Sequence, residues 1–136
     1  MSERQLSIYF RLDPRSSLAP YRQLVDQVQT AIIAGRLRGG AQLPSVRDVV
    51  AHVTINPNTV HRAYRELEHL GLAEGRRGLG TFITEQASSL ASSAVPEDLG
   101  RGLREWAIVA AHAGLTDDDM LAMLRQILNR INRITL

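Results

Sequence analysis

Amide and cationic side chains gather on one face of the stretch that runs from Asn56 to Leu70. They are Asn58, His61, Arg62 and Arg65, whereas Val60, Ala63, Leu67 and Leu70 recur at spacings of three and four on the opposite side. Asparagine offers a donor and an acceptor that match the edge of adenine, and arginine matches guanine or phosphate. The pattern predicts one helix with an apolar face toward a core and a polar face toward nucleic acid, with Asn58 reading a base.

The beginning of this helix is marked by Asn56 and Pro57. Proline is tolerated in the first turn, where its missing N–H has no intrahelical partner, and asparagine is a favourable N-cap. The amide N–H groups of the first turn point outward, and together with the Thr59 hydroxyl we expect them to hold a phosphate. Gly71 suits the left-handed residue that closes a helix.

The same side chains also have simpler explanations. Asn58 and Thr59 suit the capping of a helix start, a role that is compatible with DNA contact. Arg62 and Arg65 could pair with nearby glutamates on a solvated helix face. The elements on either side favour the DNA-binding interpretation.

A shorter helix is expected directly before this one, and a hairpin directly after it. Ser45 and Asp48 have the spacing of a capping box, which predicts a helix to about Val53. Ser45 is expected to act mainly as its cap, and as a cap it can also face a DNA phosphate. Residues 72–75 and 81–84 are short strand candidates joined by a basic tip. The tip residues of interest are Arg76, Arg77 and Gly78. Two helices with a tight turn and a basic hairpin are typical of a winged helix-turn-helix, in which the hairpin is the wing.

A strand and a further helix are expected before this pair. Leu6, Ile8, Phe10 and Leu12 alternate with polar or amphipathic residues, the period of a half-buried strand. Pro20 then opens a helical pattern that Gly35 ends. We therefore expect a first domain over residues 1–86 that contains this N-terminal strand and the winged helix-turn-helix.

Residues 87–136 are expected to form a linker, or a loose helix start, followed by a helical dimerisation tail. Thr116 and the three aspartates after it predict the start of the last helix, because a cap oxygen and carboxylates meet the positive end of the helix dipole. The apolar face of that helix is broader than one partner helix covers, which predicts a second subunit. The expected interface residues are Leu103, Trp106, Leu121, Leu124, Leu128 and Ile131, with Met120, Ile127 and Ile134 beside them.

Composition excludes several function classes. Residues 1–86 hold 11 arginines against 8 aspartates and glutamates, whereas residues 87–136 hold 5 against 6, so the front part is the basic one. The chain has no cysteine, and no two histidines share a metal-ligand spacing with a carboxylate, so we expect no metal and no other cofactor. No nucleophile, general base and oxyanion donor can be assembled, so we expect no enzyme. With no long apolar run and no leader, a cytoplasmic protein without membrane partners is expected.

These motifs resemble those of the GntR family of bacterial transcription regulators. The resemblance is carried by "PYRQLVDQVQTAIIAGRLRGGAQLPSVRDVV", "NPNTVHRAYRELEHLGL" and "GLGTFI", in order, between Ala19 and Ile83. The "NPNTV" start, the strand before the domain and the short tail are similar to the YtrA-type branch, which lacks a large effector domain. The resemblance implies a mainly α fold with a small β wing (α+β), and a repressor of its own operon, often one that encodes an ABC transporter.

The resemblance also implies roles for single residues of the helices. Arg47 matches the family's arginine near the start of the second helix, which reaches the DNA. Asn58 and Thr59 fall where the recognition helix enters the major groove. His61 falls where an arginine, lysine or glutamine is common, and a mostly neutral histidine makes a weaker match there.

In the wing, Gly78 matches the tight turn whose tip lies in or along the minor groove. Leu79 stands where a basic residue is common, and Arg76 and Arg77 supply the charge instead.

The sequence as a whole predicts a DNA-binding transcription regulator that binds a near-palindromic operator as a homodimer. The alternative is a winged helix that serves as a protein-interaction module, with the apolar tail as its assembly element. Basic residues on both the helix and the wing argue against that alternative. The tail is too short to enclose a usual small-molecule pocket, and no effector is indicated.

Overall fold

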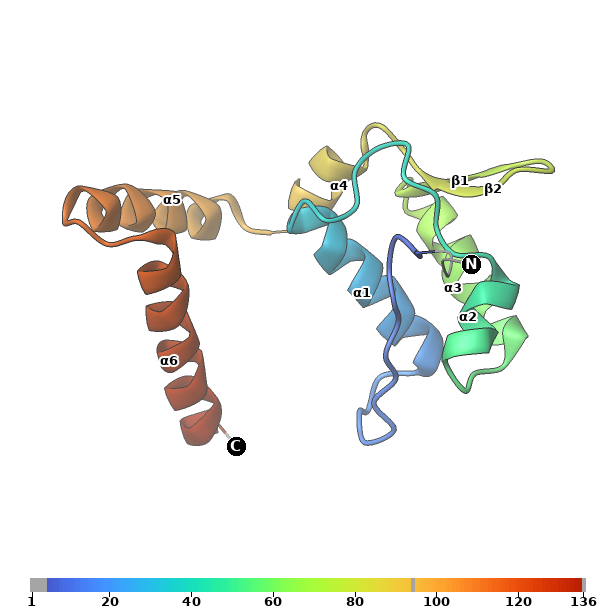
Figure 1. Ribbon diagram of the computed structural model, residues 1–136, viewed down its shortest axis with the longest axis horizontal. Coiled ribbons are helices and arrows are strands. Elements are labelled where there is room, and N and C mark those ends of the chain that lie inside the picture. The colour runs from blue at the N-terminus through green and yellow to red at the C-terminus, as the bar shows by residue number, and fades with distance from the viewer. Residues whose placement is uncertain (1–4, 94, 136) are drawn as a thin grey trace. The chain divides into compact units, whose positions relative to one another are not determined.

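The computed structural model describes residues 5–93 and 95–135, with side chains through Arg133. The elements, in chain order, are α1 (Pro20–Ile33), α2 (Val46–His52), α3 (Pro57–His69), β1 (Ala73–Arg76), β2 (Gly80–Ile83), α4 (Ala87–Ser93), α5 (Glu97–His112) and α6 (Asp117–Thr135) (Figure 1). They divide into two compact units, the second of which begins at Val95. The expected fold class, mainly α with a small β wing, is confirmed.

The core of the first unit lies between α1 and α3. Leu24 and Val28 of α1, and Val60 and Leu67 of α3, have no exposed surface. Their spacings of four and seven residues place each pair on one face of its helix, as expected. Leu70 is the exception, because α3 ends before it and the side chain is 37% exposed.

Tyr64 adds a polar tie to this core. Its ring is buried on α3, and its hydroxyl donates a hydrogen bond of 2.6 Å to the carbonyl of Pro44. Burial, and then the nearby charge of Asp48, raise the pKa of the phenol far above its ordinary value, so the hydroxyl keeps its proton. The bond ties α3 to the loop in which α2 begins.

The start of α2 follows the expected capping box. The Ser45 hydroxyl accepts the amide N–H of Asp48 at 3.1 Å, and the Asp48 carboxylate accepts the N–H of Ser45 at 3.4 Å. Together with the Tyr64 bond, this box determines where the first helix of the helix-turn-helix starts.

The prediction of an N-terminal β-strand is wrong, although the predicted alternation of inward and outward side chains is confirmed. Within residues 6–12 the side chains of Ile8 and Phe10 turn inward, and those of Tyr9 and Arg11 are exposed. The segment is extended but belongs to no β-ladder among the residues that the structure describes. Alternating apolar and polar residues indicate a half-buried extended chain, but they do not indicate which groups form hydrogen bonds with its backbone.

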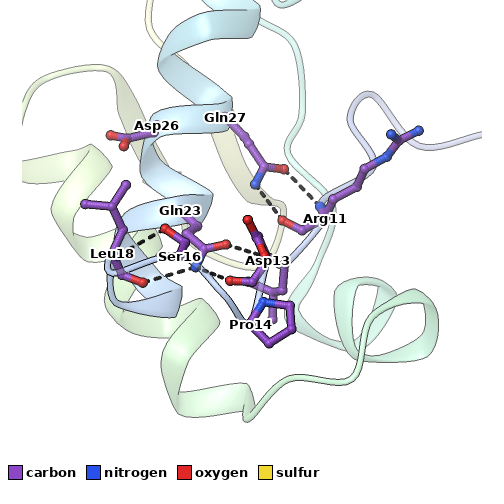
Figure 2. A pocket seen from close by; sticks show the side chains of 9 residues that line it. Arg11, Asp13, Pro14, Ser16, Leu18, Gln23, Asp26 and Gln27 are labelled. Atoms are coloured by element: carbon purple, nitrogen blue, oxygen red, sulfur yellow. Dashed lines mark hydrogen bonds between the residues drawn. The ribbon is translucent and has the colours of Figure 1, made fainter. Parts of the chain in front are cut away.

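Two glutamines of α1 take the place of a neighbouring strand (Figure 2). Gln27 accepts the N–H of Arg11 at 2.9 Å and donates to its carbonyl at 2.6 Å. Gln23 accepts the N–H of Asp13 at 2.8 Å and donates to its carbonyl at 3.1 Å. It also donates to the carbonyl of Leu18 at 3.1 Å. The one-turn spacing of the glutamines matches the two-residue spacing of their targets, so the segment runs along α1.

The boundary expected between residues 86 and 87 is also corrected. The segment expected as a linker begins with α4, and its residues Ala87 and Ala91 are buried in the core of the first unit. Because α4 packs on α1, the first unit continues to the end of α4. Residues 1–4, 94 and 136 of the two expected domains lie outside the described residues.

The second unit consists of α5 and α6. Thr116 and Asp119 form a capping box at the start of α6, with bonds of 2.9 and 3.1 Å, as the sequence predicts. The backbone and hydroxyl of Thr116 lower the pKa of Asp119. A turn at Gly114, whose φ is +92°, directs α6 away from α5 (Figure 1).

We expect Tyr64→Phe to lower the free energy of unfolding by about 1–2 kcal/mol, because the buried carbonyl of Pro44 loses its donor. Chemical denaturation followed by circular dichroism measures the change. Tyr21→Phe is the matched control, since no hydrogen bond of its hydroxyl occurs within the described chain. Equal stability of the two variants would contradict this role of Tyr64.

Candidate nucleic-acid interface

The first turn of α3 is capped from within the chain. The Asn56 side chain accepts the N–H of Asn58 at 2.8 Å, the Asn56 carbonyl accepts the N–H of Thr59 at 2.9 Å, and Pro57 has no N–H. The expectation that these amides hold a phosphate is therefore wrong. Asn56 is the cap, which leaves the exposed side chain of Asn58 without a hydrogen bond inside the described chain.

Arg62 and Arg65 differ in their surroundings. The guanidinium of Arg62 lies 3.8 Å from the ring centroid of Tyr21, a cation–π contact that joins α3 to α1. No ion pair or hydrogen bond of the exposed Arg65 occurs among the described residues. The glutamate pairing considered for both arginines is not present there.

A groove of about 310 Å³ lies between α3, the start of α2 and the wing. Its lining includes Ser45, His61 and Arg65 on one side and Leu79 and Gly80 on the other. The structure therefore brings together three segments that the sequence analysis assigned to DNA contact. Arg47 lies in the first turn of α2, exposed, and within the described chain its side chain makes no hydrogen bond or ion pair.

The wing is the antiparallel pair of β1 and β2, close to the expected residues (Figure 1). Its tip turns where Arg76 is paired with Gly80, and Gly78 has a φ of +76°, a conformation that glycine adopts readily. Arg76 binds Glu74 at 2.9 Å and covers the ring of Phe82 at 4.4 Å. Arg77 is exposed and has no such partner in the described part of the chain.

Three contributors to this surface were missed by the sequence analysis. Tyr21 holds Arg62, Phe82 supports Arg76, and Gln42 donates to the backbone of the wing. Each acts on a residue of another element, and no local pattern signals such a contact. Among the described residues no cluster of histidines and carboxylates could hold a metal ion, and no helix is long and apolar enough to span a membrane.

The chain thus combines a capped short helix, a tight turn, a second helix with a polar outer face and a hairpin whose Arg77 has no partner among the described residues, and the start of α2, α3 and the wing line one groove. This arrangement defines a winged-helix DNA-binding protein.

Comparison with known proteins agrees with this class. Residues 20–83 match the family described as "Bacterial regulatory proteins, gntR family". The chain is 34% identical to the HTH-type transcriptional repressor YtrA of Bacillus subtilis over 86% of its own length and 90% of that protein. It is 38% identical to the uncharacterised HTH-type regulator YhcF of the same organism, over 79% and 88%. A crystal structure of a transcriptional regulator from Oenococcus oeni superposes with a TM-score of 0.53 at 32% identity, covering 88% of this chain and 99% of that one.

The chain belongs to the GntR family of transcription regulators, in its YtrA-type branch. Its function is DNA binding in the regulation of transcription, and the protein-interaction module considered as the alternative is not supported.

Proposed function

We propose that this protein is a homodimeric repressor that acts without catalysis and binds a near-palindromic operator before its own operon. The name of the B. subtilis relative, a repressor similar over most of both chains, supports the direction of regulation. A role on the chromosome implies a location in the bacterial cytoplasm. The dimer itself is inferred from the tail.

The observation that carries the dimer is the lack of a core in the second unit. Of its described side chains, Ala110 is the buried one, while large apolar residues of both helices are open to solvent. The exposed set includes Leu103 (57%), Trp106 (37%), Leu121 (59%), Leu124 (39%), Leu128 (48%) and Ile131 (48%). Two helices with so little buried apolar surface do not fold stably alone in water, because burial must offset the entropy of ordering the chain.

A second copy of the tail is the occupant that we assign to this face. The face lies on a chain whose other unit carries a single winged helix, which reads one half-site. A two-fold dimer would set two such units at a fixed spacing and would join their binding energies. The paired tails would then form the apolar core that one tail lacks, and their two-fold axis would match the two half-sites of a near-palindromic operator.

The DNA contacts are assigned to side chains that have no hydrogen bond or ion pair within the described chain. Asn58 would read a base, whereas Arg47, Thr59, His61, Arg65 and Arg77 would contact phosphates or groove edges. Ser45, Arg62 and Arg76 make contacts inside the protein that position these groups. Gly78 would allow the wing tip to approach the duplex closely.

The proposed function is tested by titrating a duplex from the intergenic region upstream of the gene at several salt concentrations. We expect wild type to bind as a dimer, with an affinity that falls steeply with salt as phosphate-bound counterions are released. Leu124→Asp with Leu128→Asp should give a monomer that binds much more weakly, since the substitutions place charges on the apolar face. Sedimentation and titration on the same samples measure both effects.

The matched control is Gln126→Asp with Asn129→Asp, which adds the same charge at exposed polar positions of α6. It should remain dimeric. A Leu124 and Leu128 variant that stays dimeric, or that binds as tightly when monomeric, would remove the tail as the dimerisation element.

Asn58→Ala should relax the preference at one operator position in each half-site, at a cost of about 1–3 kcal/mol for a good bidentate contact. Because Asn56 caps the helix, the substitution should leave stability unchanged, so that a binding effect reports on the DNA contact. Binding-site selection from random duplexes measures the preference. An unchanged selected motif would exclude base reading by Asn58.

Arg77→Ala should weaken DNA binding and lower the slope of log affinity against log salt by about 0.9 for each phosphate that the protein no longer neutralises. The combination Glu74→Gln with Arg76→Met removes the ion pair of the wing at no change in net charge, and should leave the slope nearly unchanged. Filter binding across a salt series compares the two. A larger slope change for the combination would reverse the roles of the two arginines.

A further inference from the structure

The wing tip has little packing of its own. Residues 76–80 are exposed, including Leu79 at 66%, and a two-stranded hairpin alone is only marginally stable in water. Within the tip, the N–H of Leu79 donates to the carbonyl of Arg76 at 2.9 Å. Something outside the hairpin must restrain it if Arg77 is to be held ready for DNA.

The loop before α2 supplies such a restraint. Its backbone runs antiparallel to β2, with the N–H of Leu43 bound to the carbonyl of Thr81 and the N–H of Ile83 bound to the carbonyl of Ala41, both at 2.8 Å. Gln42 is paired with Phe82 in an isolated bridge. This segment therefore pairs with β2 as a short third strand of the wing would.

From this segment the side chain of Gln42 reaches the tip. Its Nε2 donates a hydrogen bond of 2.9 Å to the carbonyl of Leu79. The amide passes directly over Gly80, whose φ is +127°, and a Cβ at Gly80 would lie 2.6 Å from Nε2. The glycine thus opens the space that the glutamine occupies.

The base of Gln42 is also restrained. Its carbonyl accepts a hydrogen bond from the hydroxyl of Ser7, which belongs to the extended N-terminal segment. The loop that carries Gln42 continues into Pro44, whose carbonyl binds Tyr64 of α3. The Gln42 side chain therefore connects the wing tip to a loop whose backbone is hydrogen-bonded to Ser7 and to Tyr64.

We infer that Gln42 is a positioning residue for DNA binding, which holds the wing tip in place without contacting the duplex itself. This inference rests on the DNA contact proposed for Arg77. By restraining the tip before binding, the hydrogen bond lowers the entropy lost when the wing enters the complex. The groove shared by Gln42, Leu79, His61 and Arg65 then keeps a constant width between α3 and the wing.

The test uses the full chain, a short mixed-sequence duplex and the variant Gln42→Met, which keeps the shape of the side chain and removes the donor. Removal of a net hydrogen bond of about 1 kcal/mol corresponds to roughly fivefold weaker binding per wing. Gln86→Met is the matched control, an exposed glutamine whose side chain has no hydrogen bond in the described chain, and it should bind as wild type does. Binding of wild type to this duplex checks DNA binding separately.

A double-mutant cycle with Arg77→Ala distinguishes positioning from contact. If Gln42 acts through the wing, the Gln42→Met and Arg77→Ala effects should be non-additive; if it touches DNA itself, they should add. Hydrogen exchange gives a second measure, since the Leu79 amide should exchange faster in Gln42→Met while amides of α1 and α3 keep their protection. Additive effects, unchanged affinity or unchanged exchange at Leu79 would each overturn the inference.

Discussion

The hydrogen bond from the Tyr64 hydroxyl to the Pro44 carbonyl joins α3 to the loop from which both α2 and the support of the wing arise. After Pro44 the chain enters the Ser45 capping box and α2, and two residues before it Gln42 is hydrogen-bonded to the wing. Because Tyr64 lies on α3, the three segments that face the groove share one buried anchor. A shift of α3 would therefore move the other two with it, so that the surface offered to DNA changes as one body.

In the wing, two neighbouring arginines differ in their contacts within the protein. Arg76 and Arg77 are neighbours of the same type, yet one is bound to Glu74 and covers Phe82 while the other is exposed and makes no such contact within the described residues. On α3 the same division separates Arg62, which lies on Tyr21, from Arg65, which faces the groove. Arg62 and Arg76 are thus engaged in contacts within the protein, so the number of arginines on this surface overstates the charge available to a phosphate.

The sequence predicts those features whose causes are local. The starts of α1, α2, α3 and α6 follow from prolines and capping residues that act within one turn, and each lies where expected. The errors have non-local causes. The N-terminal segment alternates like a strand, but its partners Gln23 and Gln27 lie on a helix, and α4 is fixed by burial of Ala87 and Ala91 rather than by a distinct pattern. Gln42 offered no signal, because its partner is 37 residues away.

The closed cap of α3 has a consequence for how such a protein changes over evolutionary time. Since Asn56 and Pro57 account for the amides of the first turn, that turn presents only side chains outward. Under the base-reading role proposed for Asn58, a single codon change there would alter which operator is read, while the Asn56 cap continues to define the helix. On that proposal, operator recognition and helix formation are encoded at separate positions, so after gene duplication one copy could acquire a new set of target genes with its fold unchanged.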